Sequence, residues 1–427
     1  MTDAATPDPL TRPSDFLREL FRIAVAEADP MRMVSRHLPD RPAGRLIVIG
    51  AGKASARMAE AVEAHFGPCE GLVLTRYGYA RPTRGIEIVE AGHPVPDQAG
   101  VDATKRLLER VAGLGEDDLV LALISGGGSA LLSAPVEGLT LEDEQELNRA
   151  LLASGAPIGA MNVVRKHLSR VKGGQLAAAC HPARVLSLLI SDVPGDDPGE
   201  IASGPTVGDT STPAEAAALI DRYQVPVSDV VRQALSRPRA VVPPDDPRLS
   251  AAEARIIAAP SQSLVAAADA ARAAGCEVRQ LGDALEGEAR DLAADHAARA
   301  LALREEVART RRPILLLSGG ECTVTRRGDG IGGPNAEFVL AAALALDGAD
   351  RIHVLAGDTD GVDGAAEVAG AIAGPGTLAT ARTEGVDLAA ALASNDAHTA
   401  FGRIGGQVVT GPTLTNVNDF RALLILP

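Results

Sequence analysis

The 427-residue sequence is poor in aromatic residues: it has no tryptophan, and aromatic residues make up only 2% of the chain. A core without large rings must be built from Ala, Val, Leu and Ile packed between helices and strands. Such residues are plentiful, because 46% of the chain is hydrophobic. At roughly 150 residues per domain, the length predicts about two to three domains, and we take two as the working number. The composition therefore favours a layered α/β protein.

Cysteine is scarce as well, with no C-x-x-C pair and no Cys/His spacing typical of a metal site. The four residues are Cys69, Cys180, Cys276 and Cys322. We expect them to be buried, reduced and inert. The first twenty residues lack the basic start and apolar core of a signal peptide. The uncharged run Leu119–Val136 contains three consecutive glycines, so it predicts a strand entering a turn rather than a membrane span. Together these features favour a cytoplasmic protein.

Positive charge is also in short supply, since the formal net charge is -15. This charge repels nucleic acid and anionic membranes, so we expect a small-molecule ligand. Only four of the 41 basic residues are lysines, and two of these, Lys53 and Lys172, adjoin glycines. Either composition has drifted toward arginine, or these positions need a compact ammonium group.

Alternating apolar strands and helices predict a doubly wound, Rossmann-like N-terminal domain over residues 1–240. The expected strands are Arg45–Gly50, Gly71–Thr75, Ile86–Glu90, Leu119–Ser125 and Arg184–Ser191. The expected helices are Asp15–Ala28, Ala54–Phe66, Gln98–Ala112 and Thr140–Leu152.

A stretch rich in proline and charge, Ser236–Ser250, is typical of a linker or a long surface connection. A second α/β pattern follows it, which predicts a C-terminal α/β domain over residues 241–427. Its expected strands are Arg255–Ala259, Pro313–Ser318, Arg351–Ala356 and Arg421–Leu426, and its expected helices are Glu286–Arg309 and Asn335–Leu346.

Glycine-rich turns follow four of the expected strands. Glycine at the carboxyl end of a strand lets backbone N–H groups approach an anion, although it often marks only a tight turn. The candidate positions in three of these turns are Gly50, Gly52, Ser125, Gly126, Gly127, Gly128, Ser129, Gly319, Gly320 and Glu321. The fourth turn is Ala356–Thr359.

Lys53 distinguishes the first turn, G-A-G-K-A-S, which matches neither the P-loop nor the dinucleotide pattern. An ammonium group at a helix N-terminus is unfavourable, because that end already carries positive partial charge. A bound phosphate removes this objection. The alternative is that Lys53 points to solvent.

Two acidic loops follow apolar strands, SDVPGDD from Ser191 and GDTDGVDG from Gly357. Their carboxylates could hold Mg²⁺ together with water and phosphate. Asp-Gly pairs also form ordinary turns, so some of these aspartates are expected to be structural. We favour Asp192 and Asp360 as the ligand-side groups.

The segment Asn162–Gly174 concentrates cations in an acidic protein, with Arg165, Lys166 and Lys172 among them. On a helix, Arg165, Ser169 and Lys172 share one face, which predicts an anion-binding surface or a solvated basic helix.

Two further segments carry polar groups suited to a ligand. The segment Thr410–Asp419, with Thr410, Thr413 and Asn416, could contact a polyhydroxylated or adenine-bearing ligand, or could form local turns. His93, before a proline, is either a catalytic base or a turn residue.

Taken together, these segments resemble the glycerate 2-kinase family whose C-terminal part is the MOFRL domain, a group some of whose members carry the name hydroxypyruvate reductase. The resemblance runs from about residue 15 to residue 426. The motifs that carry it are GAGKAS (50–55), AGHPVPD (91–97), SGGGSALL (125–132), NVVRKHLSRVKGG (162–174), SDVPGDD (191–197), SGGECTV (318–324), GGPNAEF (332–338), DTDGVDG (358–364) and TGPTLTNVND (410–419).

The resemblance implies a kinase that uses ATP and a divalent metal, Mg²⁺, to phosphorylate the 2-hydroxyl of D-glycerate between two α/β domains, with the MOFRL region at about residues 312–426. It implies that Lys53 contacts phosphate, that Arg165 and Lys166 face anionic ligands with Arg165 on the glycerate carboxylate, and that Asp192 and Asp360 serve the metal or the attacking hydroxyl. Asn335, in GGPNAEF, is assigned to the nucleotide site. Many relatives have arginine where this chain has Pro334, so Arg326 or Arg327 would have to substitute, or the substrate differs.

Two other functions stay open. In an NAD(P)H-dependent hydroxypyruvate reductase, GAGKAS would be a degenerate dinucleotide turn and Arg76 would contact a 2′-phosphate. However, the strand before Arg76 ends without the expected acid, and hydride transfer explains neither Lys53 nor the aspartate loops. A non-catalytic sensor of nucleotides or sugar acids would fit the fold equally well. A homodimer is also left open.

Overall fold

The computed structural model describes residues 6–238 and 241–427, which form two compact units. One unit is Pro30–Ala258, and the other combines the described residues up to Asp29 with Ala259–Pro427. The chain therefore passes between units at residues 29/30 and 258/259, and not near residue 240 as expected. The proline-rich stretch 236–250 lies inside the first unit, before its last strand.

A six-stranded, fully parallel sheet forms the centre of the first unit, in the order β3-β2-β1-β4-β5-β6. This order confirms the Rossmann-like fold, because it is the strand order of the doubly wound dinucleotide-binding sheet. The strands are β1 (Leu46–Ala51), β2 (Glu70–Arg76), β3 (Ile86–Ala91), β4 (Leu119–Ile124), β5 (Arg184–Ile190) and β6 (Ala252–Ala258).

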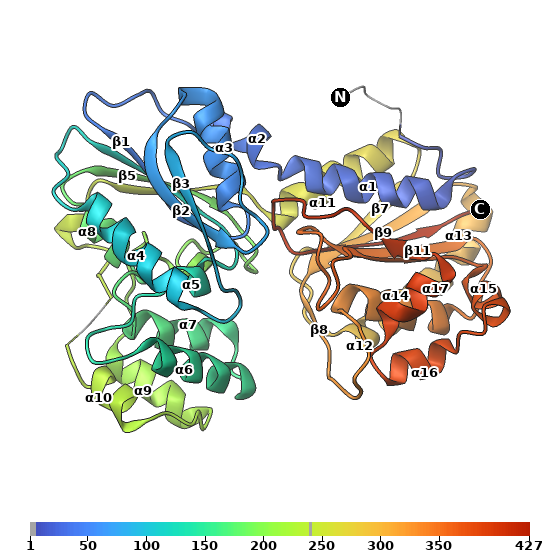
Figure 1. Ribbon diagram of the computed structural model, residues 1–427. Helices are drawn as coiled ribbons and strands as arrows, with labels where there is room; N and C mark the ends of the chain where they lie inside the picture. The colour runs from blue at the N-terminus through green and yellow to red at the C-terminus, as the bar shows by residue number, and fades with distance from the viewer. Residues whose placement is uncertain (1–5, 239–240) are drawn as a thin grey trace. The chain divides into compact units, whose positions relative to one another are not determined.

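Most residues of the central strands are buried, as continuous apolar runs require when helices cover a parallel sheet. Ile47 and Ile49 of β1 pack in one cluster with Leu107 and Leu176, and Figure 1 shows the helices of these leucines, α4 and α8, along one face of the sheet. The helices that flank or connect the strands are α2 (Pro30–Met33), α3 (Ser55–Phe66), α4 (Gln98–Val111), α5 (Gly128–Leu131) and α8 (Gln175–Cys180).

Four further helices form a separate bundle within the first unit. They are α6 (Leu141–Ala153), α7 (Ile158–His167), α9 (Pro213–Arg222) and α10 (Asp229–Leu235). Leu147, Val164 and Ile220 pack in its core. The capping box expected from Thr140 and Asp143 is present at the start of α6, where each residue's side chain accepts from the other's backbone N–H group. This bundle brings the polar faces of α6 and α7 to the site described below.

The second unit contains a mixed six-stranded sheet in the order β13-β12-β11-β14-β9-β7. The closing strand expected at the C-terminus is present as β14, antiparallel to both β11 and β9. The strands are β7 (Glu277–Gly282), β9 (Ile314–Gly320), β11 (Ile352–Asp358), β12 (Gly370–Ala373), β13 (Gln407–Val408) and β14 (Asp419–Ile425), and a small parallel pair joins β8 (Gly287–Glu288) to β10 (Cys322–Thr323).

Helices cover both faces of this sheet. Phe16 and Phe21 of α1 pack with Leu264 of α11 and with Phe420 of the sheet. Figure 1 shows α1 beside α11 on one side and α12 and α14 on the other. The helices are α1 (Pro13–Glu27), α11 (Pro260–Ala273), α12 (Ala289–Ala302), α13 (Arg304–Thr310), α14 (Pro334–Leu346), α15 (Thr377–Thr383), α16 (Leu388–Ala393) and α17 (Ala397–Ile404).

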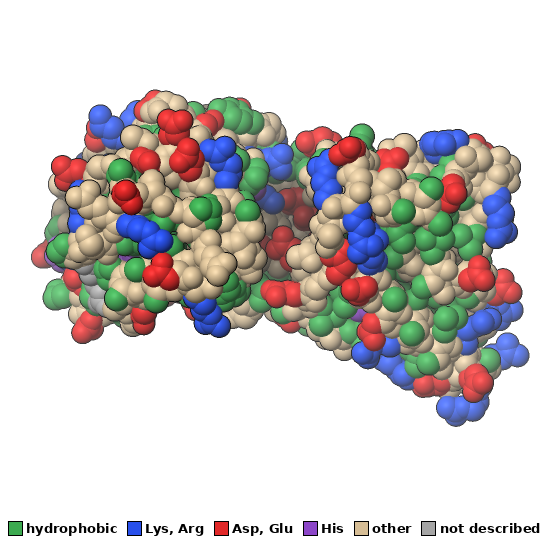
Figure 2. Space-filling view, turned by 90° about the horizontal axis from the view of Figure 1, so that it is seen from below, with side chains coloured by type: hydrophobic (Ala, Val, Ile, Leu, Met, Phe, Trp, Pro, Cys, Tyr) green, Lys and Arg blue, Asp and Glu red, His purple; other side chains and the backbone are tan. Residues whose placement is uncertain are grey.

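All four cysteines are free and buried, as expected from their spacing. Burial raises the pKa of Cys180 to about 12 and that of Cys276 and Cys322 to about 11, so these thiols stay protonated at neutral pH. Within the described ranges, no helix is long and apolar enough to cross a membrane. Figure 2 shows acidic and basic side chains interspersed over the face in view.

Candidate functional site

The turns after β1 and β4 lie side by side at the carboxyl edge of the parallel sheet. Ala51 pairs with Ile124, the last residues of these two neighbouring strands. The strand order reverses between β1 and β4, and ligands of doubly wound sheets bind at such a switch point. The geometry therefore favours these two turns as the centre of a ligand site.

Direct contacts between the two turns leave no room for a side chain at Gly52. The Lys53 N–H group donates to the Gly126 carbonyl at 2.8 Å, and the Ala54 N–H group donates to Ser125 Oγ at 3.0 Å. A Cβ atom on Gly52, whose φ is +147°, would lie 2.1 Å from Ser125 Oγ. The glycine is therefore needed for the close approach of the two turns.

His93 and Lys53 both border Gly127 in the second turn. A Cβ atom on Gly127 would lie 2.9 Å from His93 Nε2 and 3.4 Å from Lys53 Cγ. The loop that carries His93 is tied to α6, because Gln145 Nε2 donates to the Pro96 carbonyl at 2.7 Å. A role for His93 in a turn alone does not explain this position beside Lys53.

Arg165, on α7, is held by two neutral side chains. Its Nε donates to Asn148 Oδ1 at 2.9 Å and its Nη1 to Asn162 Oδ1 at 3.4 Å. Burial lowers the pKa of Arg165, although Glu144 partly offsets this effect. No carboxylate among the described residues forms an ion pair with Arg165. An oriented guanidinium without a paired carboxylate can bind an anionic ligand through two hydrogen bonds.

Lys166 and Lys172, by contrast, are occupied inside the protein. The Lys166 ammonium donates to Glu200 and Asp209, both at 2.8 Å, and its side chain is only 2% exposed. Lys172 is equally buried, and its Nζ donates to the Leu132 carbonyl at 2.9 Å. These contacts argue against the expected role of both lysines in binding the nucleotide. Both ammonium groups instead hold neighbouring segments of the first unit together.

The two aspartates expected at the metal lie in different units. Asp192 follows β5 in the first unit, at the same sheet edge as Lys53. Asp360 belongs to the second unit, is 1% exposed, and accepts the Val362 N–H group on Oδ1 at 2.8 Å. This bond two residues along the chain is an Asx turn, which is the structural alternative considered for these aspartates.

The third glycine turn, at Gly319 and Gly320, is held from inside the second unit. Arg421 is fully buried and donates to the Gly319 carbonyl at 2.9 Å and to the Gly320 carbonyl at 2.8 Å. It also pairs with Asp419 Oδ2 at 2.8 Å. Glu321 is exposed beyond the turn. No local pattern in the sequence distinguishes Arg421, which lies 102 residues from Gly319 and 101 from Gly320.

Asn335 is an internal residue, contrary to its expected role at the nucleotide. It is fully buried, and its Nδ2 donates to Asp419 Oδ1 at 2.6 Å. The N-terminus of α14 is already occupied by a carboxylate, because Asp363 accepts the N–H groups of Asn335 and Ala336 at 2.9 and 2.8 Å. Pro334 begins this helix at a position where proline is favourable.

The segment from Thr410 to Asn416 mainly braces the neighbouring acidic loop. Thr413 Oγ1 donates to the Thr359 carbonyl, and its N–H group donates to the Asp360 carbonyl at 3.2 Å. Asn416 is buried and accepts the Asn418 N–H group at 3.3 Å. Thr410 is exposed. These contacts favour the local-turn interpretation of Thr413 and Asn416.

Stability of the second unit should depend on pH through His296, which contacts Ser318 Oγ at 3.0 Å. Burial lowers the pKa of His296 to about 4, well below the value of about 6.5 in an unfolded chain. Between these pH values the unfolded chain binds a proton that the native chain does not, so stability falls as the pH falls. We expect a loss of up to about 3 kcal/mol between pH 6.5 and pH 4.

Urea unfolding at a series of pH values measures this effect. The variant His296→Gln, which is neutral throughout, should show a flatter dependence on pH. An unchanged slope in this variant would assign the acid sensitivity to other groups.

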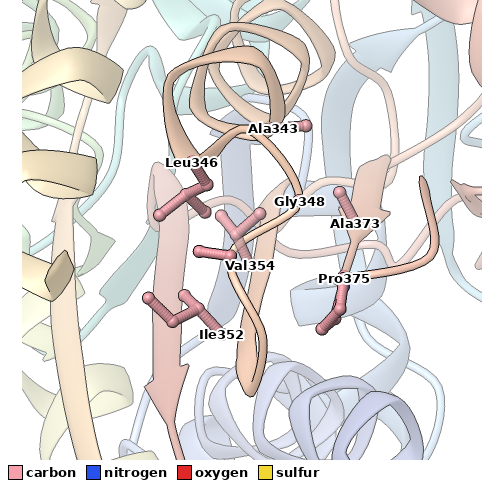
Figure 3. Close-up of a pocket in the computed structure, with 9 residues that line it drawn as sticks. Ala343, Leu346, Gly348, Ile352, Val354, Ala373 and Pro375 are labelled. Carbon is pink, nitrogen blue, oxygen red and sulfur yellow. The ribbon is translucent and has the colours of Figure 1, made fainter. Parts of the chain in front are cut away.

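Two cavities lie away from these turns. One has a volume of about 10 Å³, with room for about one water molecule. Figure 3 shows Leu346, Ile352 and Val354 among the residues that line it. The other, of about 220 Å³, is lined by Leu119, Arg184 and neighbouring residues at the amino ends of β4 to β6. Neither cavity is lined by residues of the glycine turns, which lie at the carboxyl ends of strands.

Ser203 and Asn162 were not recognised in the sequence as site residues. Ser203 Oγ lies 2.8 Å from Ser129 Oγ and donates to Asn162 Oδ1 at 3.0 Å. The available signals were the Ser-Gly-Pro turn at residues 203–205 and the position of Asn162 one helical turn before Arg165. Together these residues connect the second glycine turn with α7.

Two family models match the chain. The model described as "Domain of unknown function (DUF4147)" matches residues 16–236, and the MOFRL family model matches residues 314–419. The first covers the parallel sheet apart from β6, and the second covers most of the mixed sheet.

Relatives match almost the whole chain. A protein of Agrobacterium vitis named "Putative hydroxypyruvate reductase" is 52% identical over 96% of this chain and 94% of its own length. The D-glycerate 2-kinase of Thermotoga maritima is 38% identical over 96% of this chain and 97% of its own length. The crystal structure of a glycerate kinase from T. maritima superposes with a TM-score of 0.85 at 38% identity, covering 96% of this chain and 98% of that one.

Proposed function

This chain belongs to the family that joins a DUF4147 region to a MOFRL domain and includes the glycerate kinases, and we propose that it transfers a phosphoryl group from ATP to the 2-hydroxyl of D-glycerate. The observation that carries the proposal is the position of Lys53. Lys53 belongs to a turn at the switch point of a parallel sheet, and its backbone N–H group and side-chain Cγ lie beside a second glycine turn.

The two turns suit the phosphates of a nucleotide. Gly50, Gly52 and the 125–129 turn let the backbone approach an anion closely. Lys53 adds a compact positive charge there. Phosphoryl transfer depends mainly on alignment and on neutralising charge that develops in the transition state, and this arrangement supports both.

Arg165 suits the carboxylate of the acceptor. Its guanidinium is oriented by Asn148 and Asn162 and is not paired with a carboxylate of the protein. His93, beside Lys53, is the nearby group able to take up the proton of the attacking hydroxyl. We therefore propose that Arg165 orients glycerate and that His93 acts as the base.

The residues fit a magnesium ion that arrives with the nucleotide. In the described ranges, no group of three or more His, Cys, Asp or Glu side chains could hold a metal on its own. Mg²⁺ commonly keeps several waters and takes one or two carboxylates plus phosphate oxygens. We propose Asp192 as one of its carboxylates; when bound, the ion would neutralise phosphate charge.

A coupled assay with both candidate substrates tests the function. Purified protein with D-glycerate, ATP and Mg²⁺ should form ADP and 2-phosphoglycerate. Oxidation of NADPH with hydroxypyruvate, without ADP formation, would instead establish the reductase and reject the kinase. We propose a cytoplasmic location because the buried, protonated thiols suit a reducing compartment.

Replacing Arg165 with glutamine should mainly weaken the binding of glycerate. A charged hydrogen bond contributes about 1.5–3 kcal/mol, so KM for D-glycerate should rise about 10- to 100-fold while KM for ATP changes little. Steady-state kinetics at varied glycerate and ATP measure both. The exposed Arg170→Gln, on the same basic segment, serves as the control. A rise confined to KM for ATP would place Arg165 at the nucleotide instead.

A further inference from the structure

A continuous chain of hydrogen bonds links the turn after β4 to the charged groups of α7. Ser129 Oγ lies 2.8 Å from Ser203 Oγ, which donates to Asn162 Oδ1 at 3.0 Å. Asn162 Nδ2 donates to Glu200 Oε2 at 2.7 Å, and Lys166 Nζ donates to Glu200 Oε1 at 2.8 Å. Ser203 and Asn162 are buried, so water does not compete for these bonds.

The ion pair of Lys166 with Glu200, at one end of this hydrogen-bond series, fixes which group donates and which accepts in each bond. Burial lowers the pKa of Lys166, but Asp209 and Glu200 more than offset this effect, so the pKa is raised and the Lys166 ammonium donates to Glu200 Oε1. A carboxylate only accepts hydrogen bonds, and therefore the amide NH₂ group of Asn162 must face Glu200.

The remaining two bonds follow from this orientation. The carbonyl oxygen of Asn162 faces Ser203 and can only accept, so Ser203 donates its single proton to Asn162. The oxygen of Ser203 then has only lone pairs left for Ser129. Ser129 must therefore be the donor in the bond between the two hydroxyls, and its proton points at Ser203 Oγ.

Strained backbone holds Ser203 in this position. Ala202, Ser203 and Gly204 have φ values of +52°, +60° and +58°, which is costly for the two residues with side chains. Such strain persists only where the surroundings impose it. A Cβ atom on Gly128 would lie 2.7 Å from Ala202 Cβ, so this segment packs directly against the turn that carries Ser129.

We propose that Ser129 is a ligand of the divalent cation that accompanies the nucleotide, an inference that rests on the proposed kinase function. A hydroxyl whose proton is already donated presents only lone pairs, which repel a phosphate oxygen and bind a cation. Among the described residues, no three His, Cys, Asp or Glu side chains gather around a metal position. Phosphate oxygens and waters would therefore supply most ligands of the cation, and a single neutral hydroxyl could complete the set.

Binding of Mn²⁺ in the presence of ADP tests this assignment without measuring turnover. Electron paramagnetic resonance of free Mn²⁺ should show that Ser129→Ala weakens Mn²⁺ binding to the ADP complex by about tenfold or more. ADP affinity without metal should be unchanged. Ser203→Ala should also weaken Mn²⁺ binding, because Ser129 can then turn its proton toward the cation. The exposed Ser236→Ala is the matched control.

A second variant gives a positive signal. A thiolate prefers soft cations, so Ser129→Cys should bind Cd²⁺ with ADP more tightly than the wild-type protein does. Wild-type affinity for Mn²⁺ in Ser129→Ala would overturn the inference while leaving the kinase proposal intact. Failure of the wild-type protein to bind Mn²⁺ with ADP would contradict both.

Discussion

The variant Lys53→Ala should lose about 10²- to 10³-fold in kcat, comparable to the removal of a group that stabilises charge in a transition state. The reason is the position of Lys53 in the first glycine turn and beside the second, where its ammonium group would neutralise negative charge on the transferring phosphoryl group. The coupled formation of ADP with D-glycerate measures this loss. Folding should be retained, because Lys53 is only partly buried and its backbone contacts remain.

Two control variants sharpen the test of Lys53. Lys105→Ala removes an exposed lysine from α4 in the same unit and should leave kcat unchanged. Lys53→Arg keeps the charge but not the compact ammonium group, so it should recover only part of the activity. Near wild-type turnover in Lys53→Ala would remove the main support for the kinase proposal.

The order of strands and turns could be predicted because it depends on local patterns. Short apolar runs, such as residues 45–50, predicted five of the six strands of the parallel sheet to within a few residues, and the sixth, β6, was assigned to the other domain. Their carboxyl ends necessarily share one edge, and this rule brought Lys53 and the 125–129 turn together in the prediction. The short strands β12 and β13 have too few residues to produce a recognisable pattern and were not predicted.

The roles of charged residues could not be predicted, because they depend on partners distant in the sequence. Arg165 and Lys166 are neighbours on one basic segment, and the sequence suggested that both face anionic ligands. Their environments differ because Glu200 and Asp209 reach Lys166, whereas amides reach Arg165. Nothing in local spacing indicates which carboxylates fold back onto which cation.

The boundary between units was wrong for a related reason. The amphipathic helix α1 was assigned to the domain that follows it in the sequence, yet Phe16 and Phe21 pack on the second unit's sheet. The pattern of a helix shows that one face is buried and does not show against what. Likewise, β6 follows a proline-rich stretch that resembles a linker, but it pairs with β5.

Replacing Arg421 with leucine should lower the free energy of unfolding by about 3–5 kcal/mol, the usual effect of breaking a buried ion pair. The variant removes the donor to the Gly320 carbonyl and one of the two donors to the Gly319 carbonyl, which keeps the Leu285 N–H group. It also leaves Asp419 without its countercharge. Urea unfolding followed by circular dichroism measures the loss. Leucine at the exposed Arg309 should change stability by less than about 0.5 kcal/mol.

The dependence on pH separates the charge effect at Asp419 from the loss of packing. Burial raises the pKa of Asp419, and Arg421 acts in the opposite direction. Without Arg421 the native carboxyl should bind a proton more readily than in the unfolded chain, so the variant should become less stable as the pH rises through that raised pKa. Adding Asp419→Asn to Arg421→Leu should remove this pH dependence. An equal loss in the free energy of unfolding at pH 5 and pH 8, in Arg421→Leu with and without Asp419→Asn, would contradict the charge effect. Arg421 would then act through packing and the two carbonyls alone.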